Sequence, residues 1–271
     1  MFMYNQAMLS VTRLQADLPI LGLGQPLYFH QSIGSTNDRA AELAKQGSPH
    51  GTLVVAEEQT AGRGRAGRKW YSPANAALAL SLVLRPKDLK PESIGALSAL
   101  GALAVAEALG NEGVEAGIKW PNDVLVHDRK IAGVLVEISW EGDEAEFVIL
   151  GIGVNVRPAS IPSDDAVDFP VTCVEAVAKK RVDRHSLLLA VIEGVGRWSP
   201  QLGNNAMISA WNSRLAYLGK EVEVRMEGES VSGRVDGLTS GGRLLLVLKD
   251  GKKIEVAVGE LHLRPVDRRS N

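Results

Sequence analysis

The stretch KWPNDVLVHDRKIAG, from Lys119 to Gly133, is the most informative part of this chain. Apolar residues on both sides of a polar turn at 127–129 predict a β-hairpin over Ile118–Ile138. Burying a lysine is costly unless an anion meets its ammonium group. Lys119 and Lys130 bracket Asn122-Asp123 and an apolar strand, so together they predict a site that holds anions, although either lysine alone could extend to solvent.

A second cationic stretch, GRGRAGRKW, runs from Gly62 to Trp70. Its glycine spacing matches the dinucleotide fingerprint, but that fingerprint needs a helix directly after the glycines. Here Pro73 and a predicted strand follow, and no Gly-Lys-Ser/Thr sequence of a P-loop occurs. We interpret the stretch as a mobile loop in which Arg63 and Arg65 pair with phosphate or carboxylate oxygens and Trp70 closes over an aromatic base. The alternatives are a solvated basic loop or an RNA contact, although RNA-binding Arg/Gly segments are usually repetitive and disordered.

Two further motifs combine polar and small residues. Ser35-Thr36-Asn37 precedes a helical pattern that ends at Gly47, so it is interpreted as a helix cap that could also bind polar ligand groups. The segment Gly151–Asn155 is either a bulged strand or a strand whose glycines make room for a bound ring, with Asn155 as a polar contact. Gly133 would likewise let a ligand approach the backbone.

The pattern of elements indicates an α+β protein, in which a mixed sheet packs against helices. Besides the hairpin, strands are predicted at 27–33, 52–57, 78–84 and 146–156. Helices are predicted over 36–47, from Pro91 to near Gly110, and over 171–180, 185–198 and 206–218. Short alternating strands at 222–225, 230–235, 244–248 and 254–258 predict a small C-terminal β-barrel with a hairpin turn at Asp250-Gly251. The predicted division is an N-terminal extension (1–25) without a helix-turn-helix, a main domain (26–217) and the barrel (218–267).

Composition excludes several classes of function. The formal net charge of −2 gives no basic excess for bulk nucleic-acid binding. The single cysteine, Cys173, fits a reducing cytoplasm, and we expect neither a signal peptide nor a membrane span. The five histidines are scattered, so we expect no metal site built from side chains, and any metal would be a Mg²⁺ carried by a nucleotide.

Together these motifs closely resemble those of the biotin protein ligases, and they occur in that family's order. The matching segments are Ser35–Asn37, Glu58–Arg65, Lys119–Asp123, Arg129–Gly133 and Gly151–Asn155. The resemblance extends from about Leu27 to the end of the chain. It implies a class II synthetase-like biotin/lipoate ligase domain followed by an SH3-like β-barrel.

The resemblance also implies a two-step reaction. Biotin and MgATP would give biotinyl-5′-AMP and pyrophosphate, and a lysine of a biotin carboxyl carrier domain would then attack the adenylate. The implied biotin site comprises Ser35, Thr36, Asn37, Gln59, Arg63, Gly64, Arg65, Lys130 and Gly133. The implied ATP and adenylate site comprises Arg63, Arg65, Trp70, Lys119, Asn122 and Asn155. The implied catalytic residues are Lys130, which would bridge the biotin carboxylate and the α-phosphate, Arg65, and Asp123, a candidate proton acceptor.

The physical chemistry of such a reaction agrees with these residue types. A carboxylate that attacks a phosphate brings two anions together, so fixed cations must stabilise the developing charge. A Gly/Arg loop that orders over the intermediate would keep water away from it.

The expected partner is a biotin carboxyl carrier protein, or the carrier domain of a biotin-dependent carboxylase, with no DNA and no membrane. Some family members carry an N-terminal winged helix that represses transcription, and residues 1–25 are too few for one. The family includes monomers and dimers, so a homodimer is possible. Two rivals stay open: a lipoate or octanoate transfer enzyme on the same fold, and an inactive biotin sensor, although Gln59 and the intact Lys130 favour a biotin ligase.

Overall fold

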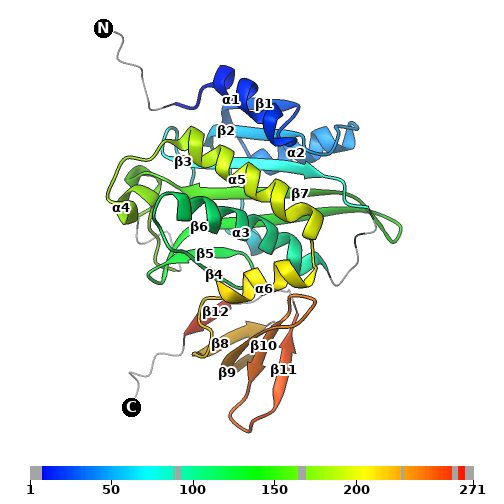
Figure 1. The fold of residues 1–271 in the computed structure, drawn as a ribbon, viewed down its shortest axis with the longest axis vertical. Helices are drawn as coiled ribbons and strands as arrows, with labels where there is room; N and C mark the ends of the chain where they lie inside the picture. Colours follow the sequence, from blue (N-terminus) through cyan, green and yellow to red (C-terminus); the bar gives the residue numbers. More distant parts are fainter. Residues whose placement is uncertain are drawn as a thin grey trace.

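The computed structural model describes residues 8–87, 89, 93–163, 169–226, 229–257 and 262–265. It contains a seven-stranded mixed sheet with packed helices and a separate five-stranded antiparallel sheet near the C-terminus (Figure 1). The predicted α+β class with a small C-terminal β domain is therefore confirmed.

The large sheet has the strand order β1-β2-β3-β7-β6-β5-β4. Its strands are β1 (Leu27–Ile33), β2 (Leu53–Gln59), β3 (Ala77–Leu84), β4 (Gly117–Lys119), β5 (Asp123–Val126), β6 (Arg129–Glu141) and β7 (Glu144–Asn155). Only the pair β1 and β2 is parallel among these neighbours. All of β2 up to Glu57 and all of β3 are buried, which explains their continuous apolar sequences.

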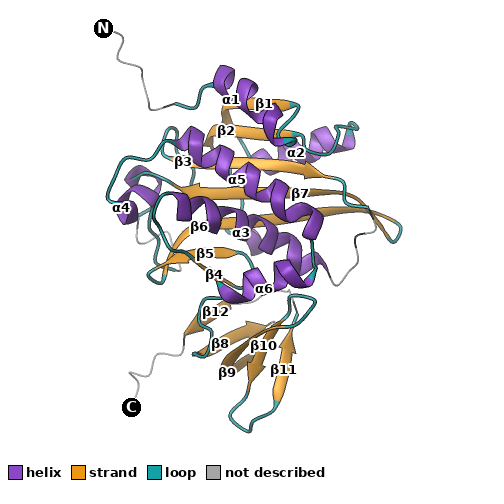
Figure 2. Cartoon of the chain, viewed as in Figure 1, coloured by secondary structure: helices purple, strands orange, loops and turns teal. Residues whose placement is uncertain are grey.

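Helices cover the two faces of this sheet unequally. Helices α3 (Ile94–Asn111) and α5 (Arg184–Trp198) lie side by side on one face (Figure 2). The two helices can approach closely because Gly194 of α5 has no side chain. A Cβ at this position would lie only 2.8 Å from Ala104 Cα of α3. Helix α2 (Thr36–Lys45) packs on the opposite face, where Val54, Val83 and Ile149 form a small core with it.

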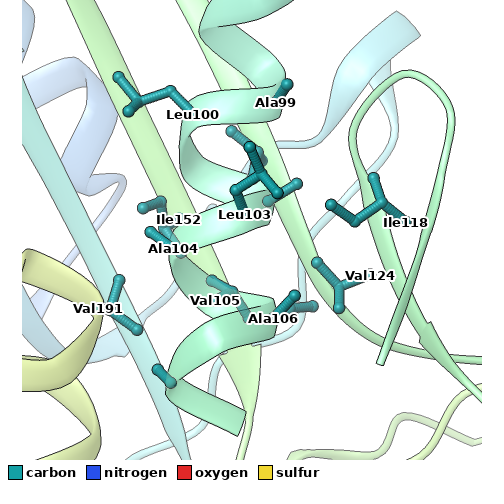
Figure 3. Close-up of a cluster of buried hydrophobic side chains, with 14 of the residues drawn as sticks. Ala99, Leu100, Leu103, Ala104, Val105, Ala106, Ile118, Val124, Ile152 and Val191 are labelled. Atoms are coloured by element: carbon teal, nitrogen blue, oxygen red, sulfur yellow. The ribbon is translucent and has the colours of Figure 1, made fainter. Parts of the chain in front are cut away.

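The main core lies between the sheet and helix α3. Figure 3 shows Leu100, Leu103 and Ala104 of this helix beside Ile152 of β7 and Val191 of α5. Helix α3 is long and apolar enough to cross a membrane, but 78% of it is buried inside the protein, as expected for the core helix of this domain. Its predicted start at Pro91 lies outside the described residues.

Three predicted elements differ from the structure because tertiary pairing overrides local sequence preference. The predicted hairpin turn at 127–129 is present between β5 and β6, but the first arm of the hairpin is divided into two paired strands, β4 and β5. Helix α4 (Val174–Ala178) is shorter than predicted because Val171 forms a bridge with Lys130 instead. Helix α6 (Asn205–Ser213) ends early because Leu215 pairs with Ile118.

Residues 8–25 contain a helix that the sequence analysis did not predict. Helix α1 (Val11–Asp17) is capped by the Ser10 side chain and continues into the 3₁₀ turn Leu18–Leu21. Leu14 and Leu18 are fully buried in the main core. This segment is therefore packed against the large domain rather than extending from it.

The C-terminal sheet has the order β11-β10-β9-β8-β12. Its strands are β8 (Glu221–Met226), β9 (Glu229–Leu238), β10 (Leu244–Val247), β11 (Lys253–Val256) and β12 (His262–Pro265). The predicted turn at Asp250-Gly251 is present, with φ of +85° at Gly251. The indole N–H of Trp120 donates a buried hydrogen bond of 2.9 Å to the carbonyl of Gly242, so this sheet is tied to the segment between β4 and β5.

Candidate active site

A cavity of about 850 Å³ lies on the α2 face of the large sheet. Successive side chains of β7 point to opposite faces of the sheet, and this alternation decides which of them line the cavity. Val148, Leu150 and Val154 face the main core. Gly151, Gly153 and Asn155 face the cavity. Every predicted site residue lines this cavity: Ser35, Thr36, Asn37, Gln59, Arg63, Gly64, Arg65, Trp70, Lys119, Asn122, Asp123, Lys130, Gly133 and Asn155. The structure thus brings together residues from segments more than a hundred positions apart.

One end of the cavity is lined by uncharged polar side chains, those of Ser35, Thr36, Asn37 and Gln59. The Thr36 backbone N–H and hydroxyl donate to Gln59 Oε1 at 2.8 and 3.0 Å. The Ser81 hydroxyl of β3 lies 2.8 Å from Thr36 Oγ1 and 2.6 Å from Asn37 Oδ1, so it holds both side chains in position. Ser35 precedes the helix, but its side chain makes no capping hydrogen bond and instead lines the cavity.

The glycines of β6 and β7 make room for side chains of the site itself. A Cβ at Gly151 would collide with the Asn37 amide, and a Cβ at Gly153 would collide with the Trp70 indole. A Cβ at Gly133 would lie 3.3 Å from the same indole. Trp70 therefore lies flat against two glycines, and any larger residue at Gly153 would displace it.

The centre of the cavity holds a buried carboxylate between two lysines. Lys130 Nζ lies 2.6 Å from Asp123 Oδ1, and Lys119 Nζ lies 3.9 Å from Asp123 Oδ2. Burial raises the pKa of Asp123, but the charges of Lys130 and Lys119 outweigh burial and hold that pKa below its usual range. Lys130 Nζ also lies 5.5 Å from the Trp70 ring centre, and Lys119 Nζ lies 4.1 Å from that of Phe169.

The Gly/Arg loop covers the cavity through its arginines. Arg63 Nη1 and Nη2 donate to the two carboxylate oxygens of Glu137 at 2.8 and 2.9 Å, and Nη2 also donates to Asp38 at 2.6 Å. The pKa of Arg63 is raised, and its hydrogen bonding to Glu137 is the largest cause. Arg65 Nη1 lies 3.3 Å from Asn122 Oδ1, so this arginine reaches the segment after β4.

Sequence analysis missed three residues that this site uses: Ser81, Asp38 and Glu137. Ser81 and Glu137 lie in strands without a motif around them, whereas Asp38 directly follows the Ser35–Asn37 motif. Every second residue of a strand points to the same face, and this alternation in β6 could have identified Glu137. Gly133, Leu135 and Glu137 share the face opposite the buried Val134. Asn155 lines the cavity as predicted, but its amide N–H donates at 3.2 Å to the carbonyl of Thr172.

Among the described residues, no group of three or more histidine, cysteine or acidic side chains could hold a metal ion.

The fold and the cavity define a ligase of the biotin and lipoate type. Residues 29–155 match the Biotin/lipoate A/B protein ligase family, and residues 217–264 match the Biotin protein ligase C terminal domain. The biotin–[acetyl-CoA-carboxylase] ligase of Paracoccus denitrificans is 36% identical, and the match covers 81% of this chain and 93% of that protein. The bifunctional ligase/repressor BirA of Bacillus subtilis is 34% identical, and the match covers 93% of this chain and 79% of that protein.

Solved structures agree with these relatives. The biotin protein ligase from Aquifex aeolicus in complex with biotin and ATP superposes with a TM-score of 0.77 at 31% identity, covering 89% of this chain and 99% of that one. The chain therefore belongs to the biotin protein ligase family, and it is an enzyme that acts as a ligase.

Proposed function

We propose that this protein activates biotin with ATP to form biotinyl-5′-AMP and then transfers biotin to a lysine of a carboxyl carrier domain. The observation that carries this proposal is a single cavity that joins an uncharged polar end to a cationic centre. A ligand with a neutral, hydrogen-bonding head and a carboxylate tail fits that division, and biotin has both.

The polar end suits the ureido group of biotin, which both donates and accepts hydrogen bonds. Asn37 and Gln59 carry amide groups that can do the same, and the hydroxyls of Ser35 and Thr36 can act in either direction. All these residues except Gln59 are buried, with exposed fractions of 3–4%. Hydrogen bonds to the ligand made there are shielded from water, which favours specificity.

The cationic centre suits the first chemical step. A carboxylate oxygen of biotin attacks the α-phosphorus of ATP, and the bond to the bridging oxygen of pyrophosphate breaks. We place the Lys130 ammonium between the carboxylate and the α-phosphate, with Lys119, Asn122 and Arg65 around the phosphate oxygens. Fixed cations at these positions offset the repulsion of the two anions and stabilise charge in the transition state.

Asp123 would hold Lys130 in this position. Its lowered pKa keeps it ionised and makes it a weak base, so we favour this positioning role over a role as proton acceptor. In the second step the carrier amine attacks the acyl carbon and AMP leaves, with the amine proton passing to solvent or to a phosphate oxygen.

The loop and Trp70 would protect the intermediate. Acyl adenylates hydrolyse when water reaches them, and an ordered loop over the cavity excludes water. The indole N–H of Trp70 is buried without a hydrogen-bond partner among the described residues, so it is available to a ligand oxygen or nitrogen. Trp70 and Asn155 line the end of the cavity that we assign to adenine, and Mg²⁺ would enter bound to ATP.

The partner we propose is the carrier domain of a biotin-dependent carboxylase in the cytoplasm. We further propose that residues 8–25 serve the ligase domain and bind no operator DNA, since Leu14 and Leu18 are buried in its core. A gel shift with specific operator binding at physiological salt would contradict this. A homodimer joined along a sheet edge is the assembly we would test by light scattering.

The direct test of the first step is biotin-dependent release of pyrophosphate from MgATP. Lys130→Ala should abolish that release without unfolding the protein, because its ammonium serves the ligand and Asp123 rather than the core. Lys253→Ala is the matched control, since Lys253 pairs with Asp236 at 2.7 Å in the C-terminal sheet and neither residue lines the cavity. Pyrophosphate release by the Lys130 variant at the wild-type rate would disprove the assigned role.

A further inference from the structure

The Gly/Arg loop is fastened across the cavity by a cluster of three charges. Arg63 faces two carboxylates that belong to different elements, Glu137 of β6 and Asp38 of α2. The contact with Glu137 is bidentate, with both oxygens engaged. Bidentate arginine–carboxylate pairs are directional as well as strong, so they fix the position of the loop and not only its charge.

The loop itself is a compact unit held together by contacts of its own backbone. Within it, the Gly64 N–H donates to the Arg68 carbonyl at 2.7 Å, and Arg63 forms a bridge with Lys69. These contacts shape the loop but do not attach it to β6 or α2. Two other side chains of the loop reach the opposite wall: the Trp70 indole packs against Gly133 of β6 and Gly153 of β7, and Arg65 Nη1 lies 3.3 Å from Asn122 Oδ1. Arg63 differs from them because it forms ion pairs with carboxylates of both β6 and α2.

Glu137 also contacts the biotin end of the site. Its Oε2 accepts a hydrogen bond from Asn37 Nδ2 at 2.6 Å and another from Arg63 Nη2 at 2.9 Å. One carboxylate oxygen therefore orients a residue on the floor of the cavity and holds the loop above it. Movement of the loop and orientation of Asn37 are coupled through this oxygen.

We propose that Glu137, assisted by Asp38, is a positioning residue that latches the loop through Arg63 and thereby sets how long the activated intermediate stays in the cavity. The residence part of this proposal rests on the proposed function, whereas the latch itself does not. The side chains of Arg63, Glu137 and Asp38 are 41%, 34% and 56% exposed, so water can replace their contacts when the loop opens. Such a latch is strong enough to favour closure and weak enough to release during each turnover.

The informative variant is Glu137→Gln. Glutamine keeps the length of the side chain and an oxygen that can accept from Asn37, but it cannot neutralise Arg63. Glu42→Gln is the matched control, because Glu42 forms a 3.0 Å ion pair with Arg39 on the outside of α2 and does not line the cavity. Far-UV circular dichroism and thermal unfolding establish that each variant is folded.

Two rates should change together in Glu137→Gln. In the ligand-free protein, trypsin should cleave the loop after Arg63, Arg65, Arg68 or Lys69 roughly threefold to tenfold faster than in the wild type. With biotin and MgATP, biotinyl-adenylate should escape into solution faster by a similar factor. Arg63→Gln should likewise speed both adenylate escape and cleavage after Arg65, Arg68 or Lys69, the sites that both variants keep. Combining both substitutions should add little at these sites, because the two residues act as one unit.

The outcomes separate this inference from the proposed function. If the wild type forms no adenylate, the proposed function fails, while trypsin cleavage of the free protein still decides whether the latch exists. If the wild type forms adenylate and Glu137→Gln matches it in loop cleavage or in adenylate release, the inference is overturned. Additive effects of the two substitutions would also overturn it.

Discussion

Replacing Asp123 by asparagine tests the charge arrangement at the centre of the cavity. The substitution keeps the shape of the side chain and removes the negative charge that lies 2.6 Å from Lys130 and 3.9 Å from Lys119. Breaking a buried ion pair costs about 3–5 kcal/mol, because an uncompensated charge stays behind. The two lysine side chains are 21% and 12% exposed, so water relieves part of this cost, and we expect a loss of roughly 2–3 kcal/mol.

This loss should be visible in thermal unfolding as a decrease in Tm of about 5–10 °C. Adenylation should fall about 10²- to 10³-fold, since Lys130 is no longer held in place.

Acid unfolding gives a second readout. The folded-state pKa of Asp123 is lowered, so its contribution to stability is complete above the unfolded pKa of about 4 and disappears as pH falls through the folded pKa. Wild type should therefore lose stability over that acidic range more steeply than Asp123→Asn. Asp236→Asn is the control, as its exposed partner Lys253 stays solvated. An Asp123→Asn protein as stable and active as the wild type would refute this account of the site.

Three further predictions follow from individual contacts. Gly153→Ala should displace the Trp70 indole and lower adenylation by at least tenfold with an intact fold, measured by biotin-dependent pyrophosphate release; undiminished activity would mean that Trp70 has no role there. Trp120→Phe should leave the buried Gly242 carbonyl without its donor and destabilise the protein by about 1–3 kcal/mol in urea unfolding, and an unchanged midpoint would argue against this tie between the two sheets. Burial raises the pKa of the Cys173 thiol, so a thiol reagent at pH 8 should react with it only on unfolding, whereas rapid labelling of the native protein would show that the site opens.

Motif-rich parts of the site could be predicted from the sequence because their chemistry is local. The two lysines beside the Pro-Asn-Asp turn and the arginines between glycines predicted anion binding only in combination, since each alone could be solvated. The two lysines do converge, but on a carboxylate of the same segment, Asp123. The sequence contains that aspartate, yet only the pairing of β4 with β5 and β6 places it between them.

The parts that could not be predicted depend on long-range pairing. Helix α1 is seven residues long and is stabilised mainly by burying Leu14 and Leu18, so its own periodicity is weak. The helices predicted over 171–180 and 206–218 are shorter in the structure. Val171 and Leu215 instead form β-bridges with Lys130 of β6 and Ile118 of β4. The alternation of β6 could place Glu137 on the cavity face, but its contact with Arg63 arises only when the loop folds back over β6.

The most direct test of the central claim is mass spectrometry of a carboxyl carrier domain incubated with this protein, MgATP and equal amounts of biotin, lipoate and octanoate. We predict that the mass of one biotinyl group is added to a single lysine, that ATP is required, and that Lys130→Ala abolishes the addition. Addition of a lipoyl or octanoyl group would show that an enzyme of this fold acts on a different substrate. No addition, together with tight binding of biotin, would contradict the account and indicate a biotin sensor.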